Sequence, residues 1–74
     1  MNKIIKFLDE LEKQKIYYRL NKVRDSVMVE ITVPGQRWEV EFMSDGDIQI
    51  EKFISNGEIY NESEISTLFK YFSN

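Results

Sequence analysis

An alternation of apolar and polar residues through the middle of the chain constrains its fold more than any other feature. The segments "VMVEITV" at residues 27–33 and "WEVEF" at residues 38–42 place a large apolar side chain at every second position. Residues 16–21 and 47–51 repeat this period of two. Because successive side chains of a strand point to opposite faces, the pattern predicts antiparallel strands with one apolar and one polar face.

The lengths of the turns follow from matching apolar partners across neighbouring strands. The "PG" pair at residues 34–35 suits a type II turn, and a two-residue loop there places Ile31 opposite Trp38. A three-residue loop at residues 44–46, with its glycine in the left-handed conformation, preserves the apolar match in the next hairpin. A two-residue loop at residues 24–25 does so in the first hairpin. These loops predict one continuous meander.

The end of the sheet is less constrained, and two arrangements remain open there. The "NG" pair at residues 56–57 favours a hairpin that adds a short last strand at residues 58–60 and sets Tyr60 opposite Phe53. Strict alternation places Phe53 on the polar face and Lys52 on the apolar face. A bulge near Lys52 would instead turn Phe53 inward and the lysine outward.

Two segments show apolar residues at helical spacing, residues 2–15 and 62–72. Their apolar stripes consist of Ile4, Phe7, Leu8 and Leu11 in the first segment and Ile65, Leu68, Phe69 and Phe72 in the second. Both helices must bury these stripes, and the sheet offers one apolar face. The sequence therefore predicts an α+β fold in a single domain over residues 1–74: an antiparallel meander of four to five strands with the N- and C-terminal helices on one face.

The polar face of this sheet carries the candidate site. The predicted register sets four charged residues opposite one another across the strands: Arg19, Glu30, Glu39 and Glu51. Glu41, Met28, Arg37 and Tyr60 lie beside this row in the same register. Like charges in opposite positions destabilise a sheet. One interpretation is a solvated face, and the other is a surface that binds a basic protein. In the second, carboxylates pair with the partner's cations, and Met28, Tyr60 and, unless a bulge turns it inward, Phe53 are apolar anchors.

The distribution of charge supports a basic partner over an acidic one. The net charge of the chain is −3, but residues 1–25 carry +3 and residues 26–64 carry −7. A strongly acidic middle disfavours nucleic acid and anionic membranes as partners, because both are negatively charged. It favours attraction of a basic protein. The oligomeric state remains open at this point.

The composition gives little support to catalysis or cofactor binding. The chain has no histidine and no cysteine, and it has no glycine-rich phosphate loop. The "SDGD" segment at residues 44–47 is too short to match a calcium loop. We therefore expect no enzyme activity, no metal and no cofactor. The charged start "MNKIIKFLDELEK" is unlike a signal peptide or a membrane span, which with the lack of cysteine favours a cytoplasmic location.

The run "VMVEITVPGQRWEVEFMSDGDIQIEKF", followed by "SNGEIY" and a short helix, resembles a group of small bacterial proteins of uncharacterised function. In size, acidity and layout the chain is similar to immunity proteins of bacterial contact-dependent and polymorphic toxin systems. This second resemblance implies a binder that neutralises a basic toxin domain, often a nuclease. The alternative hypothesis is a structural module that forms homodimers through an exposed edge strand, for which residues 16–23 are the candidate.

Overall fold

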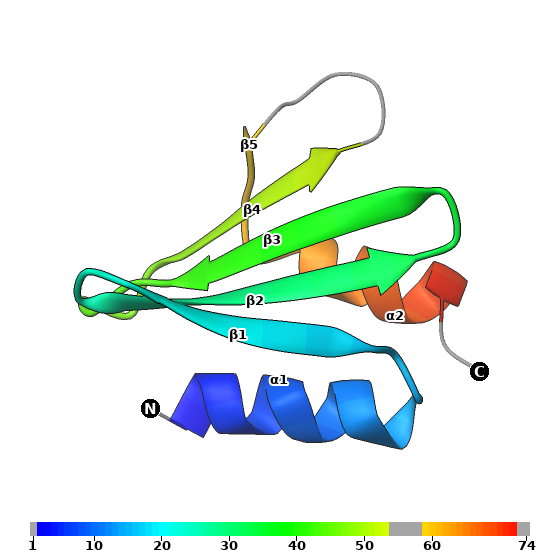
Figure 1. Ribbon diagram of the computed structural model, residues 1–74, viewed down its shortest axis with the longest axis horizontal. Helices are drawn as coiled ribbons and strands as arrows, with labels where there is room; N and C mark the ends of the chain where they lie inside the picture. The colour runs from blue at the N-terminus through cyan, green and yellow to red at the C-terminus, as the bar shows by residue number, and fades with distance from the viewer. Residues whose placement is uncertain (1, 54–58, 73–74) are drawn as a thin grey trace.

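The computed structural model, which describes residues 2–53 and 59–72, contains a four-stranded antiparallel sheet and a helix near each end of the chain (Figure 1). In chain order the elements are α1 (Asn2–Lys13), β1 (Tyr18–Val23), β2 (Ser26–Val33), β3 (Gln36–Phe42), β4 (Ile48–Phe53) and α2 (Glu64–Phe72). A two-residue segment, β5 (Ile59–Tyr60), runs antiparallel beside β4. Neighbouring strands follow one another in the chain, so the predicted α+β meander is confirmed.

The three predicted loop lengths are confirmed by the register of the strands. Ile31 lies opposite Trp38 across a two-residue turn in which Gly35 has a φ of 76°, as a type II turn requires. In the β3–β4 loop, Gly46 has a φ of 92° and its N–H donates to the carbonyl of Met43 at 3.0 Å. The first hairpin closes at residues 24–25 without glycine, and there Arg24 itself adopts a φ of 57°.

Both helices pack on the same face of the sheet, as predicted. The ring of Phe7 in α1 lies 5.5 Å from the ring of Phe42 in β3 and 5.8 Å from that of Phe69 in α2. These three side chains join the two helices to the sheet. The buried core residues are Phe7, Leu11, Ile16, Val29, Ile31, Val33, Trp38, Val40, Ile48, Ile50 and Leu68. The opposite side of β1–β4, which we call the open face, has no helix against it in the described part of the chain (Figure 1).

The facing of Lys52 and Phe53 is settled by the continuous pairing of β3 with β4. Lys52 lies opposite Trp38 and Phe53 lies opposite Arg37, with no extra residue between them. The bulge considered from the sequence is therefore wrong. Phe53 is on the open face with 39% of its surface exposed. Lys52 is on the helix side and is buried, with only 9% of its surface exposed.

The predicted position of Tyr60 is also wrong. Tyr60 lies opposite Ile50 instead of Phe53, so it shares a face with a core residue and packs against the core. The pairing of Ile54 and the turn at residues 56–57 lie outside the described residues. The shift of register moves Tyr60 from the open face to the helix side, which removes one proposed anchor from the candidate site.

Candidate protein-binding surface

The open face brings together the carboxylates that the sequence placed there. Arg19 lies opposite Glu30, Glu30 opposite Glu39, and Glu39 opposite Glu51 across four consecutive strands. We call the three glutamates the acidic row. Their alignment follows from the apolar register on the other side of the sheet, because side chains alternate strictly along each strand. The row is therefore a consequence of core formation, whereas the choice of glutamate at each position is not.

Glu30 is the best neutralised member of the row. One carboxylate oxygen accepts a hydrogen bond from the Arg19 guanidinium at 3.1 Å, and the other accepts one from the side-chain amide of Asn21. The Glu30 side chain is only 21% exposed, while that of Arg19 is 68% exposed. Both partners come from β1, so the edge strand holds this carboxylate in place.

Glu39 occupies the middle of the row and has a weaker cationic partner. Arg37 lies on the same face two residues earlier, and its guanidinium is 3.8 Å from the Glu39 carboxylate. The same guanidinium lies 4.5 Å above the ring of Phe53, which holds it by cation–π attraction. The Glu39 side chain is 23% exposed. Arg37 therefore divides its interaction between a carboxylate and an aromatic ring.

Glu51 and Glu41 have no cationic partner among the described residues. Glu51 faces Glu39 and receives no hydrogen bond from any described side chain. Glu41 lies 2.5 Å from the hydroxyl of Ser26, which is equally within hydrogen-bonding distance of the Val23 carbonyl at 2.8 Å. Two of the four glutamates on this face thus have no positive charge beside them among the described residues.

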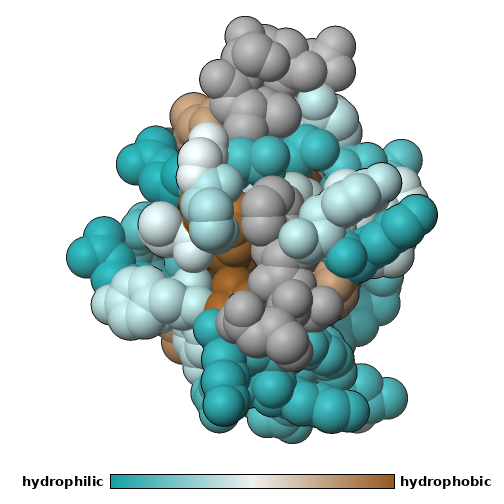
Figure 2. All heavy atoms as spheres, turned by 90° about the vertical axis from the view of Figure 1, so that its right-hand side faces the viewer, coloured by the Kyte–Doolittle hydropathy of each residue, from teal (hydrophilic) through white to brown (hydrophobic). Residues whose placement is uncertain are grey.

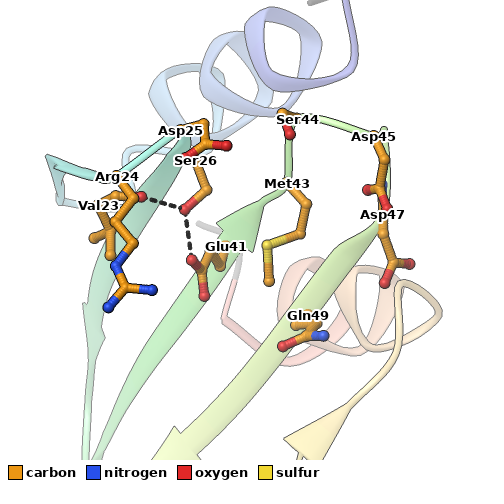
Figure 3. Close-up of a pocket in the computed structure, with 10 residues that line it drawn as sticks. All are labelled: Val23, Arg24, Asp25, Ser26, Glu41, Met43, Ser44, Asp45, Asp47 and Gln49. Atoms are coloured by element: carbon orange, nitrogen blue, oxygen red, sulfur yellow. Dashed lines mark hydrogen bonds between the residues drawn. The ribbon is translucent and has the colours of Figure 1, made fainter.

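A shallow hollow of about 600 Å³ extends the open face toward the β1–β2 and β3–β4 turns (Figure 3). Its acidic lining residues are Asp25, Glu41, Asp45 and Asp47, and its basic lining residue is Arg24. The carboxylate of Asp45 accepts a hydrogen bond from the backbone N–H of Asp47 at 2.9 Å, which orders the loop. The acidic character of the face therefore continues past Glu41 to this end of the sheet. Met28 lies opposite Glu41 and is half-buried on the same face.

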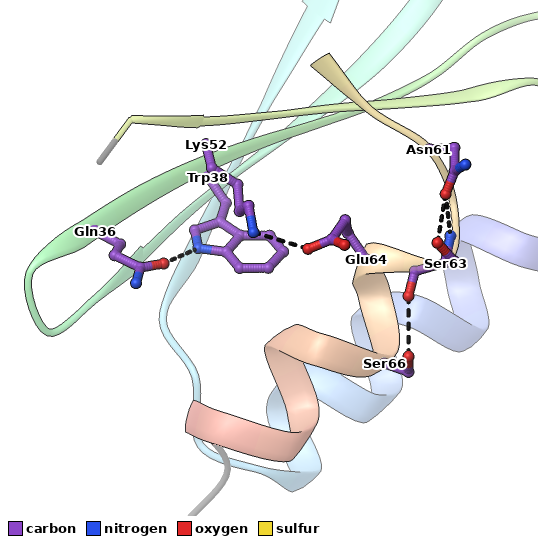
Figure 4. Close-up of polar contacts among 7 residues, drawn as sticks. All are labelled: Gln36, Trp38, Lys52, Asn61, Ser63, Glu64 and Ser66. Atoms are coloured by element: carbon purple, nitrogen blue, oxygen red, sulfur yellow. Dashed lines mark hydrogen bonds and ion pairs between the residues drawn. The ribbon is translucent and has the colours of Figure 1, made fainter. Parts of the chain in front are cut away.

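Among the described residues, Lys52 is a buried cation on the helix side of the sheet, and its charge is compensated more fully than the charges of the open face (Figure 4). The ammonium of Lys52 lies 2.8 Å from the carboxylate of Glu64 in α2. It also lies 4.1 Å from the ring centre of Tyr60 and 5.0 Å from that of Trp38. The side chain of Asn61 accepts a hydrogen bond from the N–H of Ser63 at 3.0 Å and so caps the helix that carries Glu64.

Asn61 and Glu64 have the spacing of a capping box, but only half of that motif is formed. Asn61 caps the helix, but the carboxylate of Glu64 reaches Lys52 instead of returning to the Asn61 backbone. The sequence placed Lys52 on the apolar face by strict alternation, and that signal was correct. The identity of its partner depends on where α2 docks, which no local pattern reports.

The arrangement defines a class of protein: a small α+β domain whose helices cover one face of a meander and leave an acidic face open. No family model, curated protein or solved structure was found to match this chain. Neither helix in the described part of the chain has the length and apolar character needed to cross a membrane. Among the described residues, no cluster of three or more carboxylates is suited to holding a metal ion.

Proposed function

We propose that this protein binds a basic protein domain through its open face, in the manner of an immunity protein that neutralises a toxin. The observation that carries the proposal is the acidic row, in which Glu39 lies between two glutamates and Glu51 has no cation among the described residues. Cross-strand repulsion between like charges lowers stability. A partner that supplies arginine or lysine along the row would replace that repulsion with attraction.

The apolar residues of the face suit the same role. Met28 is half-buried beside Glu41, and Phe53 is 39% exposed beneath the guanidinium of Arg37. Protein interfaces combine such anchors with charged groups at their margins. Phe53 remains a candidate anchor, as strict alternation predicted, whereas Tyr60 does not. The contact surface therefore consists of Met28, Glu30, Arg37, Glu39, Glu41, Glu51 and Phe53.

The test is a titration against the protein encoded by the neighbouring gene, by isothermal calorimetry. The variant Glu39→Lys/Glu41→Lys reverses two charges at the centre of the face, and we expect it to weaken binding at least about a hundredfold, by analogy with close charge pairs at interfaces. The control Asp9→Lys/Glu62→Lys makes the same change in net charge at exposed positions outside the open face. Equal binding by both variants would show that the open face is not the site.

The alternative is self-association through β1, which is the end strand of the sheet. Its exposed edge favours this function, since unpaired strand edges pair readily with other strands. Light scattering at high protein concentration distinguishes the two: a dimer supports the structural module, and a monomer that binds the basic domain supports the immunity-like role.

A further inference from the structure

The outer edge of β1 presents backbone groups that no described strand uses. The N–H of Thr32 donates to the carbonyl of Tyr17 at 3.5 Å, which identifies residue 17 as facing β2 with its hydrogen-bonding groups. Because these groups alternate along an antiparallel strand, Arg19, Asn21 and Val23 also bond to β2. Tyr18, Leu20 and Lys22 therefore direct their N–H and C=O groups away from the sheet.

The side chains of β1 leave this edge accessible. Five of its six residues are exposed, and Tyr18 is half-buried. Leu20 points to the helix side, opposite Val29, yet 50% of its surface is exposed. Val23 is 38% exposed at the end of the strand. An added strand would cover Leu20, because a residue paired with it lies on the same face.

The positive charge of the β1 edge favours an acidic strand as its partner. Residues 15–24 contain four basic residues and no acidic residue. Arg19 points to the open face and Lys22 to the helix side, so both faces of the edge carry positive charge. Arg19 already binds Glu30, but a guanidinium has five N–H donors and this one is largely exposed.

A second copy of the chain fits this edge less well than an acidic strand does. When β1 pairs with itself so that Leu20 meets Leu20, Arg19 lies opposite Asn21 and Lys22 opposite Tyr18, so neither cation gains a carboxylate partner. Basic residues on edge strands commonly prevent such self-pairing. An acidic strand meets no such barrier.

We propose that the outer edge of β1 binds an extended acidic segment of another protein as an added strand. In an antiparallel arrangement, the segment has an apolar residue opposite Leu20 and acidic residues opposite Arg19 and Lys22. Backbone hydrogen bonds to Tyr18, Leu20 and Lys22 supply sequence-independent affinity, and the side-chain pairs supply selectivity. This surface is separate from the proposed contact on the open face and selects partners of the opposite charge.

The probe is the acetylated and amidated peptide Val-Glu-Thr-Val-Glu-Thr, titrated into the full chain and followed by heteronuclear NMR. Its second valine pairs with Leu20 when its glutamates meet Arg19 and Lys22. We expect the amide signals of Tyr18, Leu20 and Lys22 to shift more than those of Arg19 and Asn21, because only the first group points outward. Largest shifts on β3 or β4, or no binding, would overturn the proposal.

Two altered peptides and two variants of the chain separate the contributions of backbone pairing and charge to binding. The peptide with lysine in place of both glutamates, and the peptide methylated on the backbone nitrogen of its second valine, should both lose binding. The variant Lys22→Glu should weaken binding of the parent peptide by at least about fivefold, since it replaces an attractive pair by a repulsive one. The variant Lys6→Glu changes an exposed residue of α1 by the same charge and should bind as the wild type does.

The variant Glu39→Lys/Glu41→Lys should retain peptide binding, so this proposal and the proposed function fail independently. Loss of peptide binding in that variant, with its fold preserved, would place the peptide on the open face and overturn the edge assignment. Equal affinity of the parent peptide for Lys22→Glu and for the wild type would likewise contradict the role given to charge.

Discussion

The two faces of the sheet differ in how completely their charged side chains are compensated. On the helix side, Lys52 is buried but has a carboxylate at 2.8 Å and two aromatic rings around its ammonium. On the open face, Glu39 is half-buried with a glutamate on either side and a single arginine at 3.8 Å. Burial of a charge is tolerated where compensation is complete. The incomplete compensation on the open face is the basis of our proposal that a partner binds there.

The largest test of this contrast is removal of the anion from the helix side. Glu64→Ala leaves the ammonium of Lys52 buried without its carboxylate. We expect it to lower the free energy of unfolding by about 3 kcal/mol, the lower end for a broken buried ion pair, because the Glu64 side chain is 23% exposed. Lys52→Met keeps an apolar chain against Trp38 and should lower it by less than about 1 kcal/mol. Urea denaturation measures both values. A smaller loss for Glu64→Ala than for Lys52→Met would contradict the account of the buried pair.

On the open face, removal of a carboxylate is expected to raise the free energy of unfolding, by a smaller amount. Glu51→Gln removes a charge that faces Glu39, and it should raise the free energy of unfolding by about 0.5 kcal/mol. Gln49→Glu, which places a new carboxylate opposite Glu41, should lower it by a similar amount. Urea denaturation at low ionic strength gives the comparison, and added salt should shrink both effects. If Glu51→Gln proves destabilising, the row is not under repulsion.

The smallest expected effect concerns the hydrogen bond between Tyr18 and Glu12 on the helix side. The hydroxyl of Tyr18 donates to Glu12 at 2.5 Å, and this hydrogen bond, with smaller contributions from desolvation and nearby acidic charge, raises the pKa of Tyr18. Because the folded-state pKa lies above the ordinary value of about 10, the resulting stabilisation is complete below that pH and is lost as pH rises through the folded-state pKa.

Glu12→Gln should therefore lower the pKa of Tyr18 toward its ordinary value, measured by NMR titration of the tyrosine rings. Glu10→Gln is the matched control, since that carboxylate accepts a hydrogen bond from Gln14 and is not a cause of the shift. An unchanged titration of Tyr18 in Glu12→Gln would show that the hydrogen bond is not formed in solution.

Hydrophobic and hydrophilic residues are also unevenly distributed at the end of the molecule where β1 begins. Figure 2 views this end and shows the strongest hydrophobic colouring near its centre, with paler hydrophobic patches at the upper left and at the right among hydrophilic residues. The exposed Leu20 and Val23 of β1 are exceptions to the general covering of apolar side chains. An added strand on β1 would complete that covering for Leu20.

Much of the fold was predictable because its signals are local. The alternation in β2 and β3, together with "PG" at residues 34–35, was sufficient to align Ile31 with Trp38 and therefore Glu30 with Glu39. A shift of one residue would expose the whole apolar set, so the correct register has no close competitor. Six of the seven predicted contact residues lie on the open face for this reason, although their role in binding stays a prediction.

The position of Tyr60 and the environment of Lys52 depended on contacts distant in sequence. Alternation alone indicates the face of Lys52, but an unpaired lysine there is so unfavourable that the sequence equally allows a bulge. Docking of α2 brings Glu64 to the ammonium, and the pairing of β5 with β4 places Tyr60 beside it. The sequence by itself thus determined β1 to β4, the turns between them and the acidic row, because steric and hydrophobic periodicity act between neighbours. Only the tertiary structure decided which charges are neutralised, because a partner's distance depends on how separate elements pack.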